Sequence, residues 1–146
     1  MSHMNLPVEE FTTPTLVTAT EDESIDRLDD LMQLYEIRHI PIVKDGRVVG
    51  IVSDRDLKLV LGLSFVEKII FYAADIMIID LVTVSASASL DEVAFEMAQK
   101  KIGSVIVNDE NDELFGIFTV TDALNALIEI ARVAQIDEKV FQNNYI

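Results

Sequence analysis

The residues best suited to chemistry belong to one motif that occurs twice. In each copy a glycine precedes two apolar residues and a hydroxyl residue, and an aspartate follows the hydroxyl: Ser53 and Asp56 in the first copy, Thr119 and Asp122 in the second. A hydroxyl at the start of a helix can help to hold a phosphate, because the first N–H groups of a helix are unpaired and carry a partial positive charge. An aspartate can accept hydrogen bonds from the paired hydroxyls of a ribose. The motif therefore predicts a nucleotide site.

A simpler interpretation is that Ser53 and Thr119 cap helices and that the two aspartates are ordinary first-turn charges. For a single copy of the motif, helix capping is the stronger interpretation. The repetition favours the ligand interpretation, because packing does not require an aspartate in both copies.

The repetition extends over most of the chain. Val17-Thr18 aligns with Val82-Thr83, 65 positions later, and after one inserted residue the two motifs align at a spacing of 66. A repeat at a fixed spacing indicates a duplicated structural unit. Each copy of about 55 residues is too small to bury a secure core alone, so we expect the two copies to pack as one module.

This duplicated pattern, together with RHIPIV at Arg38 to Val43, resembles a tandem pair of cystathionine-β-synthase (CBS) domains, or Bateman module. The resemblance covers about residues 8 to 132. It implies an α+β fold in which two β-α-β-β-α repeats pack as one pseudo-two-fold module. We expect repeats at residues 8–62 and 75–132, a linker helix at 63–74, and a tail at 133–146 whose role the sequence does not define.

Local patterns predict the elements of each repeat. The first repeat is expected to contain a strand at Leu16 to Ala19, a helix capped by Ser24, strands at Ile40 to Val43 and Arg47 to Val52 joined by an Asp-Gly turn, and a helix at Asp54 to Leu61. The second repeat is expected to contain a helix with a Ser89/Glu92 capping box, strands at Ser104 to Val107 and Glu113 to Phe118, and a helix at Thr121 to Arg132. Ser64 to Ala74 also shows a capping-box pattern, which predicts a further, buried helix.

The resemblance implies two clefts between the repeats, where adenine nucleotides and related adenosyl compounds bind in such modules. In the first cleft, Arg38 and His39 would bind phosphate and the Pro41 ring would form an apolar wall for adenine. A strand-end role is the simpler interpretation of His39. The nucleotide-binding residues expected there are Val17, Thr18, Arg38, His39, Ile40, Pro41, Thr119, Thr121 and Asp122.

The second cleft would differ in charge. It has Gly103 where the first has Arg38, and it depends on Arg55 and Lys58 for positive charge, although both could instead form surface ion pairs of little energetic value. We therefore expect the cleft at Asp122 to bind more strongly. The residues expected in the second cleft are Ser53, Arg55, Asp56, Val82, Thr83, Ser104, Val105 and Ile106.

Composition argues against several classes of protein. The net charge of −15 disfavours a nucleic-acid surface. The absence of cysteine excludes disulfides and thiolate metal sites, and with no signal-peptide pattern it favours a cytoplasmic protein. The longest apolar stretch, broken by Asp75 and Asp80, cannot span a bilayer. The start, MSHM, reads as a cloning remnant before a natural Met4, so His3 is set aside. We expect no catalytic residue, no metal site and no required cofactor, since the sequence has no dinucleotide fingerprint, no P-loop and no ligand cluster.

The sequence therefore predicts a regulatory module that senses an adenosyl ligand and acts on a separate partner protein. AMP, ADP, ATP, an S-adenosyl compound and NAD all remain open as ligands. The alternative is a dimerisation scaffold without a ligand. We also expect a homodimer, because helices near Leu57 to Leu61, Phe65 to Tyr72 and Leu124 to Ile130 carry more apolar surface than so small a module can cover.

Overall fold

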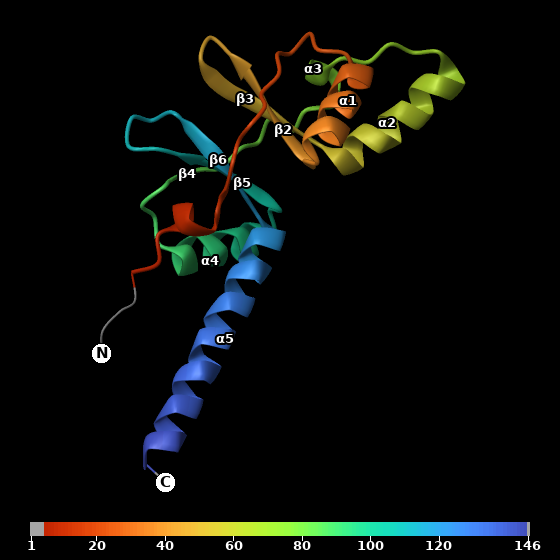
Figure 1. Cartoon of the computed structure of the whole chain (residues 1–146). Helices are drawn as coiled ribbons and strands as arrows, with labels where there is room; N and C mark the ends of the chain where they lie inside the picture. The colour runs from red at the N-terminus through yellow and green to blue at the C-terminus, as the bar shows by residue number, and fades with distance from the viewer. Residues whose placement is uncertain (1–4, 146) are drawn as a thin grey trace.

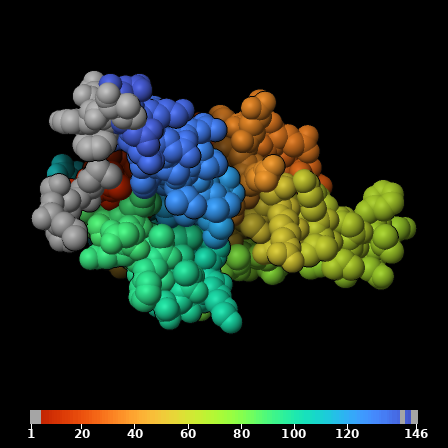
Figure 2. All heavy atoms as spheres, turned by 90° about the horizontal axis from the view of Figure 1, so that it is seen from below, coloured from red at the N-terminus to blue at the C-terminus, as the bar shows by residue number. Residues whose placement is uncertain are grey.

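The structure, a computed structural model, describes residues 5–145. It has the mixed α+β fold that the sequence predicts, and the two repeats form neighbouring lobes (Figures 1 and 2). The first lobe contains α1 (Ile25–Tyr35), β2 (His39–Lys44), β3 (Arg47–Ser53) and α2 (Asp54–Glu67). The second contains β4 (Thr83–Ser85), α4 (Leu90–Lys100), β5 (Ser104–Asn108), β6 (Leu114–Thr119) and α5 (Val120–Tyr145). Three short elements connect the lobes: η1 (Val8–Phe11), β1 (Thr13–Pro14) and α3 (Ala73–Ile76).

Several local predictions for the first lobe are confirmed. The Ser24 hydroxyl accepts a hydrogen bond from the Arg27 N–H at 3.2 Å and caps α1, whose apolar stripe is buried against the hairpin of β2 and β3. That hairpin turns at Asp45 and Gly46, whose φ angles of 52° and 77° are the positive values that a tight hairpin turn needs. The Asp-Gly pair therefore fixes the register of the two strands.

Each repeat begins with a leading segment, residues 6–14 and 71–79, that pairs with the other repeat. β1 runs antiparallel to β6, with Thr13 opposite Ile117, and at the equivalent place Ile78 pairs with Ile51 of β3. In Figures 1 and 2 the red start of the chain accordingly lies with the green and blue second lobe. Neither repeat is complete without the other's leading segment, which explains why the two pack as one module.

The exchange of leading segments is closely symmetric. The Val8 N–H donates to the Ala88 carbonyl at 2.8 Å, and 65 positions later the Ala73 N–H donates to the Glu23 carbonyl, also at 2.8 Å. The short helix α3 is therefore the counterpart of η1 and belongs to the second repeat.

The motif glycines permit this exchange. Gly50 and Gly116 are buried where the leading segment of the other repeat crosses the hairpin. A Cβ atom at Gly116 would overlap the backbone carbonyl of Thr13, and a Cβ atom at Gly50 would overlap the side chain of Met77. The glycine of the motif is thus explained by close packing and not by a ligand.

Two predicted elements of the first half are wrong. Leu16 to Ala19 is not a strand: the ordered strand is β1, and Ala19 forms only an isolated bridge with Ile42. The reason is that the chain there crosses from the sheet of the second lobe to that of the first. Ser64 to Ala74 is not a helix, because α2 runs on to Glu67 and ends at Lys68, whose φ is 55°.

The apolar side chains from Leu63 to Ile70 are consequently exposed and not buried as expected, whereas Phe71 packs against the core and Ala73 is buried. Ser64 lies inside α2, and its hydroxyl donates to the Ile69 carbonyl at 2.6 Å instead of capping a new helix. Phe65 is 87% exposed, and Val66 and Ile70 are each 73% exposed. Figure 2 shows this yellow-green end of α2 projecting from the body of the molecule.

The second half also differs in two details. Ser89 is at the N-cap position of α4, but its side chain makes no capping hydrogen bond, so the predicted capping box does not form. α5 continues well past Arg132, and the tail described as far as Tyr145 is its C-terminal half, which extends away from the sheets in Figure 1. Ile146 lies outside the described residues. None of the helices between residues 5 and 145 combines the length and hydropathy that a membrane crossing needs.

Candidate functional site

A cavity of about 600 Å³ lies where the two repeats meet. It is bounded by the leading segment of the first repeat, by the junction of α1 and β2, and by the start of α5. Its size falls in the range of small-molecule sites. The lining residues are Thr13, Pro14, Thr15, Leu16, Val17, Glu36, Ile37, Arg38, His39, Gly103, Ile117, Thr119, Val120, Thr121 and Asp122.

Asp122 is the most strongly bonded side chain of this cavity. Its Oδ2 accepts from the Thr119 N–H at 2.9 Å and from the Thr119 hydroxyl at 3.0 Å, while its own N–H donates to Thr119 Oγ1 at 3.3 Å. This is a reciprocal cap at the start of α5, so the capping interpretation of Thr119 is correct as far as it goes. Within residues 5–145, Asp122 Oδ1 accepts a single hydrogen bond, from the Thr13 hydroxyl at 3.4 Å, and keeps capacity to accept from a ligand.

The charges around the cavity are mixed. Burial lowers the pKa of His39 below its ordinary value, against the opposing effect of the Asp122 and Asp54 carboxylates, and the nearby Arg38 guanidinium lowers it further. His39 is therefore neutral at pH 7 in the unliganded protein. Arg38 itself is exposed at the rim and forms no ion pair within residues 5–145. A ligand anion would meet a free guanidinium there.

Most of the residues predicted for this cleft do line it. The cavity brings together Val17, Arg38, His39, Thr119, Thr121 and Asp122. Three others do not take part: Thr18 is exposed outside the lining, and Ile40 and Pro41 are buried. The prediction that Pro41 forms a wall for adenine is wrong, because its ring packs inside the hairpin opposite Ile51.

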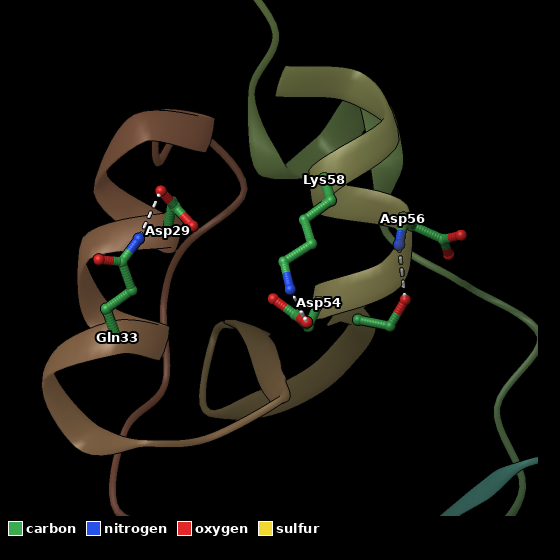
Figure 3. A network of polar contacts seen from close by, with 6 residues as sticks. Asp29, Gln33, Asp54, Asp56 and Lys58 are labelled. Carbon is green, nitrogen blue, oxygen red and sulfur yellow. Dashed lines mark hydrogen bonds and ion pairs between the residues drawn. The ribbon is translucent and has the colours of Figure 1, made fainter. Parts of the chain in front are cut away.

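The first copy of the motif, at Ser53 and Asp56, is built differently. The Ser53 hydroxyl accepts from the Asp56 N–H at 3.2 Å and caps α2, as in the simpler interpretation. The Asp56 carboxylate makes no hydrogen bond within the described part of the chain and points away from its neighbours (Figure 3). Lys58 forms an ion pair with Asp54 at 2.9 Å, and the exposed Arg55 forms none among the described residues.

The structure does not gather the residues predicted for the second cleft. Thr83 lines a small depression of about 320 Å³ that is rich in acidic residues, whereas Val105 and Ile106 are buried in the core. Val82 packs against the core of the second repeat, and Ser104 is half-buried at the start of β5. Neither of the two cavities includes Ser53, Arg55 or Asp56.

The pseudo-symmetry explains why the two copies differ. Ile78 is the counterpart of Thr13, so Asp56 has no hydroxyl donor from the other repeat. Gly103 was expected in the second cleft, but it lines the cavity at Asp122. Sequence reasoning also missed residues 13–16, Glu36, Ile37, Ile117 and Val120. The run of hydroxyl residues Thr12, Thr13 and Thr15 was the available signal, since their counterparts near Ile78 are largely apolar.

The arrangement suits a ligand with a ribose and a phosphate. Asp122 can accept from ribose hydroxyls, Thr121 and the N-terminus of α5 can donate to a phosphate, and Arg38 supplies a charged fork. Among the described residues, no group of three or more His, Cys, Asp or Glu side chains is placed to hold a metal ion.

Comparisons with known proteins agree with this fold. The model of the CBS domain matches residues 8–62 and 73–129. The crystal structure of the AcuB protein from Vibrio cholerae superposes with a TM-score of 0.76 at 29% identity and covers 91% of this chain and 99% of that one. The crystal structure of CBSX2, an Arabidopsis thaliana protein, in complex with AMP superposes with a TM-score of 0.68 at 26% identity, covering 86% of this chain and 98% of that one.

One curated relative is an enzyme. The inosine-5'-monophosphate dehydrogenase of Korarchaeum cryptofilum is 30% identical over 114 residues, which make up 78% of this chain and 23% of the dehydrogenase. The chain thus spans less than a quarter of the length of that relative.

Proposed function

Because the chain belongs to the CBS domain family, which matches both of its repeats, we propose that it is a regulatory module that binds adenine nucleotides or related adenosyl compounds in the cleft at Asp122. The observation that carries the proposal is the meeting of Asp122, the start of α5 and the unpaired Arg38 in one cavity. The complex of CBSX2 with AMP supports the same ligand class.

The proposed mechanism is a shift between arrangements of the two repeats. The cavity is lined by residues 13–17 and 36–39 of one repeat and by residues 117–122 of the other, so a bound ligand touches both. The binding free energy of the ligand then favours one relative orientation of the two repeats, and a separate partner protein would recognise that orientation. The proposed mechanism requires no catalytic step and no cofactor. The cytoplasmic location stays a prediction. A ligand-free scaffold is the competing function.

Isothermal titration with AMP tests the proposal directly. We expect the unmodified protein to bind AMP at one strong site per chain, in the cleft at Asp122. No heat and no thermal shift with AMP, ADP, ATP, S-adenosylmethionine or NAD would leave the scaffold function standing.

The neutral state of His39 predicts that AMP binding depends on pH. A phosphate near the imidazole raises its pKa, so binding takes up a proton and the affinity increases as pH falls. We expect the dissociation constant to drop by about two- to threefold between about pH 7.5 and 6.5. The drop is small because the phosphate begins to protonate in the same range, which weakens its attraction to His39. His39→Asn should remove this increase in affinity and leave only the opposite effect of phosphate protonation. An unchanged pH profile in that variant would show that His39 does not face the phosphate.

We further propose that the module is a homodimer. Apolar side chains that the single chain leaves exposed lie on α2 and on the outer side of α5: Leu59, Leu63, Phe65, Val66, Leu124, Leu127 and Ile128. Exposed apolar patches of this kind mark interfaces. Leu57 was expected in this surface, but it is fully buried in the core of the first repeat.

Sedimentation equilibrium measures the association. At micromolar concentration we expect about twice the chain mass of 16.3 kDa. Leu127→Lys should shift the protein toward monomer, because it places a charge in the packed surface, whereas Leu34→Lys on α1, which is also exposed, should not. A clean monomer for the unmodified protein would refute the dimer.

A further inference from the structure

We propose that the cleft selects nucleoside monophosphates over di- and triphosphates, and that the Glu36 carboxylate at its rim sets this selection. The inference rests on the proposed function and adds the ligand class and the residue responsible. It follows from the charges that line the cavity and from the backbone position of Glu36.

The cavity has little positive charge to offer. Among the described residues that line it, Arg38 is the single lysine or arginine, and it stands against two carboxylates, Glu36 and Asp122. On the neighbouring helix α2, Lys58 is paired with Asp54 at 2.9 Å, and neither Lys58 nor Arg55 lines the cavity. One phosphate ester, which carries a charge of about −1.5 to −2 at pH 7, can be matched by Arg38 and the start of α5. Further phosphates would find no second lysine or arginine among the described residues that line the cavity, and they would repel Glu36.

The fold does not explain why residue 36 is acidic. Glu36 is the C-cap of α1 in the left-handed conformation, with φ of 53°, and its N–H donates to the Gln33 and Met32 carbonyls. Lys101 holds the equivalent position after α4, with φ of 54°, so the same turn accepts a cation. A carboxylate at the C-terminal end of a helix is unfavourable to the helix dipole, where a lysine is favourable. The Glu36 carboxylate therefore does not stabilise its helix, whereas it does add a negative charge to the cleft.

The side chain of Glu36 also lies close to where a phosphate would bind. It precedes Arg38 by two positions, and both residues line the same cavity. Because both are exposed, the repulsion is screened by water and salt, and its effect on affinity is modest. The selection should consequently weaken as ionic strength rises.

Isothermal titration of the full chain with adenosine, AMP, ADP and ATP in magnesium-free buffer tests the proposal. At about 0.05 M salt we expect AMP to bind about tenfold more tightly than ATP, with ADP between them. Glu36→Gln should reduce this ratio by about threefold by strengthening ATP binding. The matched control is Asp30→Asn, which removes a like charge from an exposed position on the same helix that does not line the cavity, and it should leave the ratio unchanged.

The possible outcomes separate this inference from the proposed function. Binding of ATP as tightly as AMP, or an equal change of the ratio in Glu36→Gln and Asp30→Asn, would overturn the selection by Glu36 while leaving the nucleotide module intact. Failure of all four compounds to bind would overturn the selection, and failure of S-adenosylmethionine and NAD as well would overturn the proposed function. The proposal would be supported if the ratio of AMP affinity to ATP affinity falls in Glu36→Gln but not in Asp30→Asn. The ratio of the unmodified protein should also decrease at about 0.5 M salt.

Discussion

Asp122→Ala is expected to weaken AMP binding by about ten- to a hundredfold. The loss of a hydrogen bond to a charged group costs about 1.5–3 kcal/mol, and every 1.4 kcal/mol or so is a factor of ten in affinity. Asp122 is the acceptor for the ribose in the proposed complex, and its Oδ1 has the free capacity to serve there. Asp56→Ala should have a much smaller effect, because Asp56 lies in neither cavity.

Because Asp122 also caps α5, a loss of stability must be separated from a loss of ligand contacts. Removal of an N-terminal cap costs about 0.5–2 kcal/mol of stability. Asp122→Asn keeps an oxygen acceptor of the same shape and should retain more of the fold, while still losing the charge that attracts ribose hydroxyls. Titration of all three variants, with thermal unfolding as the check on folding, decides the matter. Equal losses for Asp122→Ala and Asp56→Ala would contradict the asymmetry between the two motif copies.

The sequence predicted the repeated architecture because that architecture depends on residues that recur at a fixed spacing. The hydroxyl-aspartate motif correctly identified the starts of α2 and α5, and the Asp45-Gly46 pair identified the hairpin. Ser53 and Thr119 do cap their helices, so the simpler interpretation holds alongside any ligand role. A pattern within one segment was sufficient for the helix starts, the caps and the hairpin.

What the sequence could not predict depends on contacts between segments that are distant along the chain. The burial of Pro41 follows from its place opposite Ile51 in the hairpin, not from its residue type. Thr13 reaches Asp122 only because the two repeats exchange their leading segments. The capping-box pattern at Ser64 was misleading for a similar reason, since α2 was already helical there and simply continued. Local propensity cannot decide whether a helix starts or goes on.

Gly116→Ala is expected to destabilise the protein by about 1–3 kcal/mol, the usual cost of adding a methyl group to a closely packed site. The added Cβ would overlap the Thr13 carbonyl, which is backbone and can move only if β1 separates from β6. The substitution should therefore also weaken AMP binding, because β1 carries the hydroxyl that reaches Asp122. Urea denaturation measures the stability, provided that the m value is the same in the variant and the unmodified protein, and isothermal titration measures AMP binding.

Two other glycines provide the controls for this prediction. Gly50→Ala should cost less than Gly116→Ala, because the Cβ meets the flexible side chain of Met77 and not backbone. Gly62→Ala should stabilise the protein by about 0.5–1 kcal/mol, since Gly62 is exposed inside α2, has no neighbour within 4 Å of an added Cβ, and costs conformational entropy in a helix. If Gly116→Ala unfolds at the same urea concentration as the unmodified protein, β1 does not cross β6 as closely as described. The recurrent glycine of the motif would then need an explanation other than the close pairing of each repeat with the other's leading segment.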